Sequence, residues 1–255
     1  SPALEKLVSY SWNCNSYLDV NSVYTSAGST AMGIMYQHAE WNDYTDQYDG
    51  VSWVGGYDWD DGYIDKTRNT WFSNCSGCSV ELLSLNSGEV VMMYNYSSPT
   101  EARRSGDDFE TPVEIFPHKS DQLSAALGPY GKGHVVSSYY GGSGVYYQMK
   151  IATRNGAGDW TEPELIGGGK YGMLTFAPNG DPVVAAQGDE GIDVWQRMDG
   201  TWTVTASLPF DDGGTGHPGI VVDEHGRYHV SLSRWGYSGD LNGVYYVMLC
   251  PDLSN

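Results

Sequence analysis

The sequence predicts an all-β protein, and three observations lead to this fold class. Helical periodicity is almost absent, because only residues 3–8 have a helical composition. Short runs rich in Val, Tyr, Ile and Met recur between clusters of Gly, Pro, Asn and Asp, as at residues 89–94 and 134–139. Turn signals repeat at a nearly constant interval. With 255 residues, 40% of them hydrophobic, the chain can build one core, and we assign residues 1–255 to a single domain.

The repeat consists of turns at Gly88, Gly131, Gly180 and Gly226, each with an apolar run on both sides. Successive glycines are 43, 49 and 46 residues apart, and a four-stranded propeller blade has about 40 to 50 residues. The spacing therefore predicts a β-propeller of about five four-stranded blades, with six blades as the alternative.

The five predicted blades occupy residues 15–74, 75–117, 118–168, 169–210 and 211–255. The first unit is the longest, and we assign its polar, aromatic segment 41–62 to an insertion loop. The last unit ends soon after its third strand. We expect residues 1–7, which resemble 161–166, to supply the missing outer strand and close the ring. A helix over residues 3–8 is the rival interpretation.

A second kind of turn recurs at the same position within successive repeats, at residues 104–112, 154–163 and 197–203. Each of these turns is followed by a short strand. These turns resemble the Asp-box (BNR-type) turns between the third and fourth strands of sialidase-like β-propellers. The resemblance is degenerate, because no unit has the full Ser-x-Asp-x-Gly-x-x-Trp pattern. Asp boxes are structural turns in that class, so the resemblance implies a fold and no activity.

The charge balance excludes several functions. Lys and Arg number 13 against 32 Asp and Glu, which gives a net charge of −19 and a pI near 4.4. A protein this acidic lacks the basic face that nucleic acids require, and it is repelled by anionic membrane surfaces. No apolar run reaches the about 18 residues of a membrane-spanning helix. The chain begins at Ser1 without a visible signal peptide, which suits a processed product.

The cysteines and two sequons favour a secreted glycoprotein. The predicted blade arrangement places Cys14, Cys75 and Cys78 in loops on the same face, so Cys14 is expected to pair with Cys75 or Cys78, unless the last two pair locally. Cys250 falls within a predicted strand and is expected to be a buried free thiol, although a bond to Cys14 would tie the termini. The triplets beginning at Asn74 and Asn95 are candidate glycosylation sites.

The predicted blades bring one set of polar and aromatic residues to the propeller face where ligands usually bind. Interleaved aromatic and acidic side chains suit carbohydrate, in one central or inter-blade site. The candidates are His38, Glu40, Trp41, Tyr94, His118, Lys119, Asp121, Tyr139, Tyr140, Lys170, Tyr171, Asp189, Glu190, Asp211, Asp212, His217, Arg234, Trp235 and Tyr237. Packing between blades is the competing explanation for any single aromatic residue.

A polysaccharide-cleaving enzyme is the alternative function. The segment 217–230 looks like blade openings in propeller polysaccharide lyases. That resemblance implies His217 or His118 as the base, Arg234 or Lys119 as the partner of a uronate carboxyl group, and Tyr139 or Tyr140 as the acid. A glycoside hydrolase would instead need two carboxylates about 5 to 9 Å apart. Sialidase activity is not expected, because only Arg234 of the seven arginines is placed on this face.

One acidic segment resembles a calcium loop without matching the EF-hand pattern. Its candidate ligands alternate along the chain: Asp58, Asp60, Asp61 and Asp65. A solvated acidic loop is the other interpretation. No other cofactor is expected, because nucleotide-binding, serine-hydrolase and zincin motifs are absent from the sequence.

We therefore predict a secreted, extracellular, non-catalytic β-propeller that is carbohydrate-binding and lectin-like, with a glycan or polysaccharide as its partner. Assembly of an extracellular structure by self-association is a variant of this prediction. The enzyme that cleaves polysaccharide by elimination or hydrolysis remains the alternative.

Overall fold

The computed structural model describes the backbone in segments separated by gaps: residues 17–24, 30–42, 47–58, 63–65, 80–86, 89–95, 98–105, 108–109, 113–118, 120, 122–141, 147–155, 157–209, 214–215, 217–235 and 243–251. These residues form five antiparallel sheets and a single short 3-10 helix. The prediction of an all-β protein is confirmed. No helix within these segments is long and apolar enough to cross a membrane.

The first two sheets come from the N-terminal half of the chain. The first contains, in spatial order, β1 (Tyr17–Tyr24), β2 (Thr30–Asn42), β3 (Gln47–Asp58) and β4 (Tyr63–Asp65). The second contains β5 (Val80–Ser84), β6 (Val90–Asn95) and β7 (Pro99–Ser105), with β8 (Asp108–Phe109) and β9 (Val113–Glu114) sharing the outer edge of β7.

The assignment of segment 41–62 to a loop was wrong. Residues 47–58 are strand β3, and they pair with β2 along its length, from Asn42 opposite Gln47 to Ala31 opposite Asp58. The aromatic and β-branched residues of this segment suit a strand. The extra length of the first unit therefore lengthens a hairpin.

The next sheets are arranged in the same way. The third contains β10 (Gln122–Leu127), β11 (Gly133–Tyr140), β12 (Tyr147–Thr153) and β13 (Glu164–Gly168), with the 3-10 helix η1 (Pro129–Gly131) between its first two strands. The fourth contains β14 (Lys170–Phe176), β15 (Pro182–Gln187), β16 (Gly191–Met198) and β17 (Thr201–Pro209). In the fifth, β18 (Gly214–Thr215) and β19 (Gly219–Val222) pair with one edge of β20 (Tyr228–Trp235), and β21 (Gly243–Leu249) with the other.

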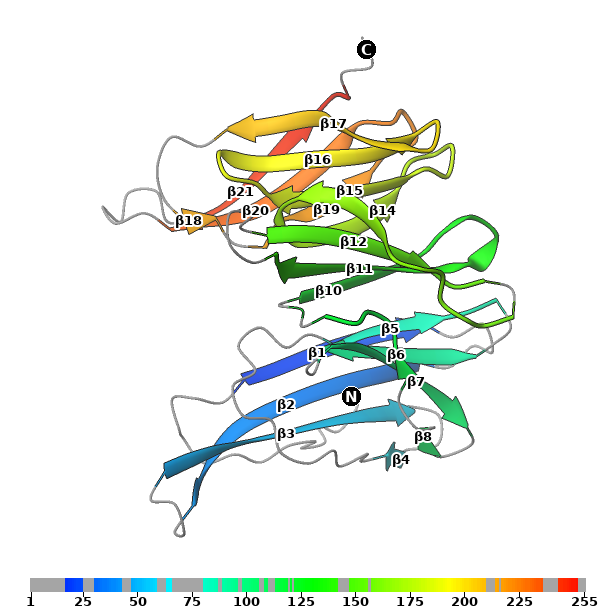
Figure 1. Cartoon of the computed structure of the whole chain (residues 1–255), viewed down its shortest axis with the longest axis vertical. Helices are drawn as coiled ribbons and strands as arrows, with labels where there is room; N and C mark the ends of the chain where they lie inside the picture. Colours follow the sequence, from blue (N-terminus) through cyan, green and yellow to red (C-terminus); the bar gives the residue numbers. More distant parts are fainter. Residues whose placement is uncertain are drawn as a thin grey trace, which may run out of the picture.

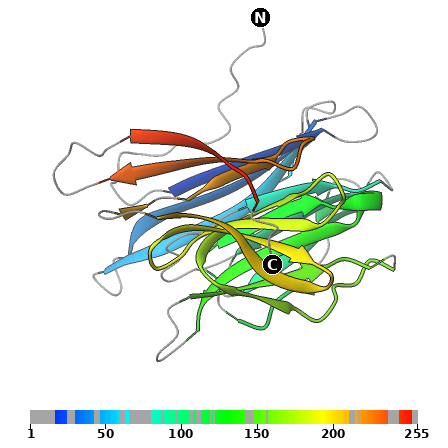
Figure 2. The same cartoon turned by 90° about the horizontal axis from the view of Figure 1, so that it is seen from above.

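The sheets follow one another in space as they do in the chain (Figure 1). In the first four sheets the first strand of each sheet contacts the first strand of the next, since β5 contacts β1 and β10, and β10 contacts β14. In the fifth sheet the contact with β14 is made by β19. Seen from above, β20 and β21 lie along one side of the molecule (Figure 2). The third and fourth sheets, which contain β12 to β17, therefore each have a neighbouring sheet on both sides.

Burial on both faces explains why the middle strands are continuously apolar. On β15, Val183 and Ala185 pack toward β16 and β20, while Val184 and Ala186 pack toward β12 and β14. Successive side chains of a strand point to opposite faces, so an unbroken buried run requires a cover on each side. Residues 183–186 are fully buried for this reason.

The fifth sheet differs because described side chains on the far face of β21 are exposed. Val244 and Tyr246 on β21 are 84% and 66% exposed, and they alternate with Tyr245 and Val247, which lie on the face toward the fourth sheet with Leu232 and Val230. Cys250 is exposed because β21 ends at Leu249, so the prediction that Cys250 is a buried thiol was wrong.

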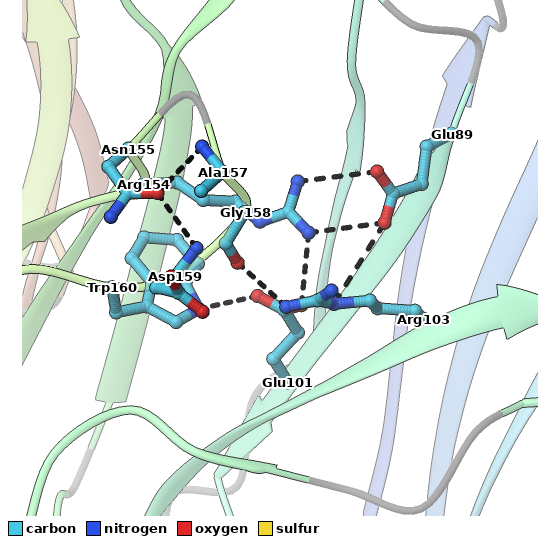
Figure 3. Close-up of polar contacts among 9 residues, drawn as sticks. All are labelled: Glu89, Glu101, Arg103, Arg154, Asn155, Ala157, Gly158, Asp159 and Trp160. Atoms are coloured by element: carbon cyan, nitrogen blue, oxygen red, sulfur yellow. Dashed lines mark hydrogen bonds and ion pairs between the residues drawn. The ribbon is translucent and has the colours of Figure 1, made fainter.

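An ionic network with a buried centre joins the second sheet to the third (Figure 3). Glu101 on β7 is 1% exposed, and its carboxylate accepts hydrogen bonds from Arg103 Nε at 2.6 Å, from Arg154 Nη2 at 3.4 Å and from the indole of Trp160. Arg154 also contacts Glu89, with Nη2 at 3.1 Å from Oε1. Two carboxylates and two guanidinium groups are thus balanced in the interface.

The turn that carries Trp160 is one of those predicted to link a third to a fourth strand. Asn155 Oδ1 accepts hydrogen bonds from the backbone N–H groups of Ala157 at 2.9 Å and Asp159 at 3.0 Å. Arg103 donates to the carbonyl of Gly158 across the interface at 2.7 Å. The turn between β12 and β13 is confirmed, as is the corresponding turn at residues 199–200 between β16 and β17.

Candidate functional site

Predicted site residues cluster where the second strand of each sheet ends and the third begins. Tyr139 and Tyr140 end β11, and Tyr140 is paired with Tyr147 at the start of β12. Lys170, at the start of β14, is paired with Gln187 at the end of β15. Within each sheet these positions lie at the same end, which is where the sequence placed the candidates.

Side-chain contacts join the third, fourth and fifth sheets at this end. Lys170 Nζ lies 4.7 Å from the ring centroid of Tyr147 and 4.4 Å from that of Tyr171. The Tyr171 ring stacks on His217, with centroids 4.0 Å apart and an interplanar angle of 16°. Burial alone would lower the pKa of the Lys170 ammonium, but hydrogen bonds and charge interactions with Tyr171 and Tyr147 outweigh burial and raise this pKa. The cation is therefore held among aromatic rings.

Tyr171 has an unusual backbone conformation. Its φ of +58° is uncommon for a bulky residue, and the pairing of β14 with β15 is irregular between Lys170 and Met173. Residues held in this region cost about 1–3 kcal/mol and persist where their surroundings fix them. The bulge turns the Tyr171 side chain toward His217 and Lys170.

A pocket of about 820 Å³ opens beside this cluster, between the third and fourth sheets. Its walls are Tyr147, residues 168–170 and the hairpin 187–191, completed by Asp193 and Trp195 and by the end of β17 at residues 207–209. Gly191 permits the close approach of β16 and β17, because a Cβ atom there would lie 2.1 Å from the carbonyl oxygen of Leu208. The volume is within the range of small-molecule sites, about 300 to 1,000 Å³.

The pocket combines aromatic surface with carboxylates. Asp189 and Glu190 are the central residues of a tight turn in which Gly188 N–H donates to the carbonyl of Gly191 at 2.8 Å. Asp193 lies deeper, and its Oδ1 accepts a hydrogen bond from Ser207 Oγ at 2.6 Å. Aromatic faces and fixed carboxylates together suit a polyhydroxylated ligand, because sugar C–H groups stack on rings while sugar hydroxyls donate to carboxylates.

His118 forms a second cluster, with Tyr139. Their ring centroids are 3.9 Å apart, and His118 Nε2 lies 3.3 Å from Ser137 Oγ. Tyr139 donates to Gln148 Oε1 at 2.5 Å. Burial, then the charge of Lys150, lowers the pKa of His118 to about 4 against the opposing effect of Glu114. A base of this strength is poorly matched to proton abstraction near neutral pH, which argues against His118 in the predicted lyase role.

Stability is expected to fall on acidification in a window set by His118 and His134. The pKa of His134 is also lowered from 6.5 to about 4, by burial and then by the charge of Lys132. Between pH 6.5, the ordinary pKa of histidine in the unfolded chain, and about pH 4, its pKa in the folded protein, the unfolded chain binds protons that the folded protein does not. The free energy of unfolding therefore decreases as the pH falls from about 6.5 to 4. The variant His134→Asn removes one of the two groups and should flatten the profile. Urea titrations of both proteins at several pH values in this window test this, and equal slopes would contradict it.

The remaining predicted residues are placed only in part. The structure gives backbone positions for His38, Glu40 and Trp41 near the end of β2, Tyr94 and Asn95 at the end of β6, Arg234 and Trp235 at the end of β20, Asp58 on β3 and Asp65 on β4. Outside the described residues lie Lys119, Asp121, Asp211, Asp212, Tyr237, Asp60, Asp61, Cys14, Cys75, Cys78 and Asn74. Among the residues that the structure covers, no three His, Cys, Asp or Glu side chains form a group that could hold a metal ion.

The sequence did not single out several pocket residues, namely Tyr147, Gln187, Asp193, Trp195 and Ser207. Most lie on third or fourth strands, whereas the candidates were taken from loops and second-strand ends. Asp193 and Trp195 are two residues apart and so point to the same face of β16. Asp193 is also paired with Ser207 in the register. The alternation of Asp193 with the apolar, buried residues Ile192 and Val194 could have indicated that Asp193 faces away from the core and lines this wall of the pocket.

The chain matches no known family model and no curated protein sequence. Its structure, by contrast, resembles solved structures. One is the α-L-arabinofuranosidase Arb93A of Fusarium graminearum with an iminosugar inhibitor, at 10% identity over 91% of this chain and 76% of that one, with a TM-score of 0.57. Another is the Penicillium chrysogenum α-L-arabinanase with arabinobiose, at 11% identity over 91% and 76%, with a TM-score of 0.54.

A third similar structure is YjhT, at 7% identity over 91% of this chain and 84% of that one, with a TM-score of 0.52. The α-L-arabinofuranosidase and the α-L-arabinanase are β-propeller proteins. At these identities the likeness shows the fold, so the protein is a β-propeller.

Proposed function

We propose that this β-propeller binds carbohydrate in the pocket between its third and fourth sheets. The observation that carries the proposal is the combination of the Tyr147 and Trp195 side chains with the carboxylates of Asp189, Glu190 and Asp193 around one cavity of about 820 Å³. Rings offer stacking surface, and carboxylates offer acceptors for hydroxyl groups. The neighbouring structures crystallised with arabinobiose and with an iminosugar support a sugar ligand by analogy of fold.

Glycoside hydrolysis is the second candidate function, and two observations favour it. The pocket wall concentrates three carboxylates, the group that performs acid, base or nucleophile chemistry on glycosidic bonds. Two of the neighbours named above are an α-L-arabinofuranosidase and an α-L-arabinanase. Release of reducing ends from a bound oligosaccharide would assign this activity, whereas binding without turnover would leave a binding module.

Substitution of Tyr147 tests the site. We expect Tyr147→Ala to weaken binding of a neutral oligosaccharide about tenfold, about 1.4 kcal/mol, because the sugar loses a stacking surface and Lys170 loses one of its two rings. Isothermal titration calorimetry measures the change. Tyr130→Ala is the control, since Tyr130 is 94% exposed in the η1 turn at the opposite end of the third sheet. Equal affinity of the two variants would contradict this placement of the site.

Several finer features of the prediction remain proposals. The Asn155 turn contacts, with Trp160 three residues beyond the turn centre, support membership of the sialidase-like Asp-box class. Among the described strands, β21 lies at the edge of the fifth sheet and pairs with β20 alone, which supports a ring of about five blades closed by the N-terminal residues. Secretion, glycosylation, the disulfide pairs and the calcium loop rest on the sequence.

A further inference from the structure

The charges around the pocket narrow the class of glycan that it can accept. Of the described residues that line the cavity, three are acidic and Lys170 alone is basic. The lysine ammonium lies over the rings of Tyr147 and Tyr171, at 4.7 and 4.4 Å from their centroids. Its charge is therefore engaged within the wall, while the carboxylates of Asp189 and Glu190 are exposed at the mouth.

The acidic side chains are held in place by local structure. Asp189 and Glu190 occupy the tip of a hairpin that is closed by the hydrogen bond from Gly188 N–H to the Gly191 carbonyl. Asp193 Oδ2 lies close beneath this tip, because a Cβ atom on Gly188 would be only 2.4 Å from it. Ser207 fixes the other carboxylate oxygen of Asp193. The negative charges thus extend from the mouth of the pocket into its interior.

We infer that the glycan recognised by this pocket carries protonated amino groups, as amino-sugar oligomers do. This inference rests on the proposed carbohydrate-binding function. A ligand ammonium can donate charged hydrogen bonds to the carboxylates at the mouth while its sugar rings contact Tyr147 and Trp195. Uronate-containing polymers would place like charges against the same carboxylates, and the net charge of −19 disfavours their approach.

The test compares three oligosaccharides of equal length with the full chain: a glucosamine oligomer, its neutral N-acetylated analogue and an oligogalacturonide. Titration calorimetry is done below neutral pH, where the amines are protonated, in the presence of EDTA. We expect the glucosamine oligomer to bind at least about tenfold more tightly than the N-acetylated analogue, the preference to shrink at high salt, and the oligogalacturonide not to bind.

The double variant Asp189→Asn/Glu190→Gln should lose most of this preference, because its affinity for the glucosamine oligomer falls further than its affinity for the neutral analogue: the amides still accept hydrogen bonds from hydroxyl groups but carry no charge. Asp199→Asn is the matched control, because Asp199 is an exposed acid in the turn at the other end of β16, and its preference should not change. If the neutral analogue binds as tightly as the amine, or the double variant keeps the preference, the inference is overturned while the proposed function stands. If no oligosaccharide binds, both are overturned. Binding of Ca²⁺ alone that requires Asp189 and Glu190 would also overturn the inference.

Discussion

Replacing Glu101 with Ala is expected to lower the free energy of unfolding by about 3–5 kcal/mol. The Glu101 carboxylate is 1% exposed and accepts hydrogen bonds from Arg103, Arg154 and the indole of Trp160. Its removal leaves the buried Arg154 guanidinium with Glu89 as its remaining carboxylate partner. It also leaves the half-buried Trp160 N–H without that acceptor, which adds to the cost.

The control for this prediction is Glu164→Ala. Glu164 pairs with Arg197 at 3.0 Å, but the two side chains are 42% and 41% exposed, and exposed ion pairs contribute about 0–1 kcal/mol. Urea denaturation of both variants measures the difference. A loss for Glu101→Ala no larger than that for Glu164→Ala would show that the network in Figure 3 does not hold the second and third sheets together.

The parts of the fold that local sequence specifies were predictable. The turns at Gly180 and Gly226 both have positive φ, +89° and +79°, which glycine adopts without strain, and each falls between two strands as the spacing predicted. The continuous apolar run at residues 183–186 likewise reports burial on both faces of β15. Strand β3 was missed because Gly, Asp and Gln interrupt its alternation, and its pairing with β2 supplies what local preference does not.

The sequence predicted at which end of the sheets the candidate site lies, but not the contacts within it. Residues at the ends of second strands could be aligned between repeats, so Tyr139 and the Asp189–Glu190 turn were found. Contacts between sheets depend on how neighbouring repeats are rotated relative to each other. The spacing of turns along a single sequence does not report this rotation. Tyr171 lies on β14, and His217 lies between β18 and β19, about 46 residues further along the chain. The stacking of the two rings could therefore not be derived. Nor could the position of Asp193 beneath the turn.

Tyr228 links the stability of the fourth and fifth sheets to the shape of the pocket. Its side chain is fully buried between them, and its hydroxyl donates to Gln196 Oε1 at 2.6 Å and lies 2.8 Å from Thr205 Oγ1. Burial raises the pKa of Tyr228, more than the bond to Thr205 lowers it, so the hydroxyl remains a donor at neutral pH. Gln196 and Thr205 belong to β16 and β17, the strands that carry Asp193 and Ser207 into the pocket.

We therefore expect two effects from substitutions at Tyr228. Tyr228→Ala should lower the free energy of unfolding by about 3–5 kcal/mol, because it leaves a cavity between the sheets. Tyr228→Phe removes only the hydroxyl and should cost about 1–3 kcal/mol, because Gln196 loses its buried donor. Val244→Thr, at an 84% exposed position of the same sheet, should change stability by about 0.5 kcal/mol or less. If the hydroxyl also fixes β16 against β17, Tyr228→Phe weakens glycan binding under conditions where the variant is fully folded. Unchanged affinity in the Phe variant would show that the Tyr228 hydroxyl does not influence the position of the pocket wall on β16 and β17.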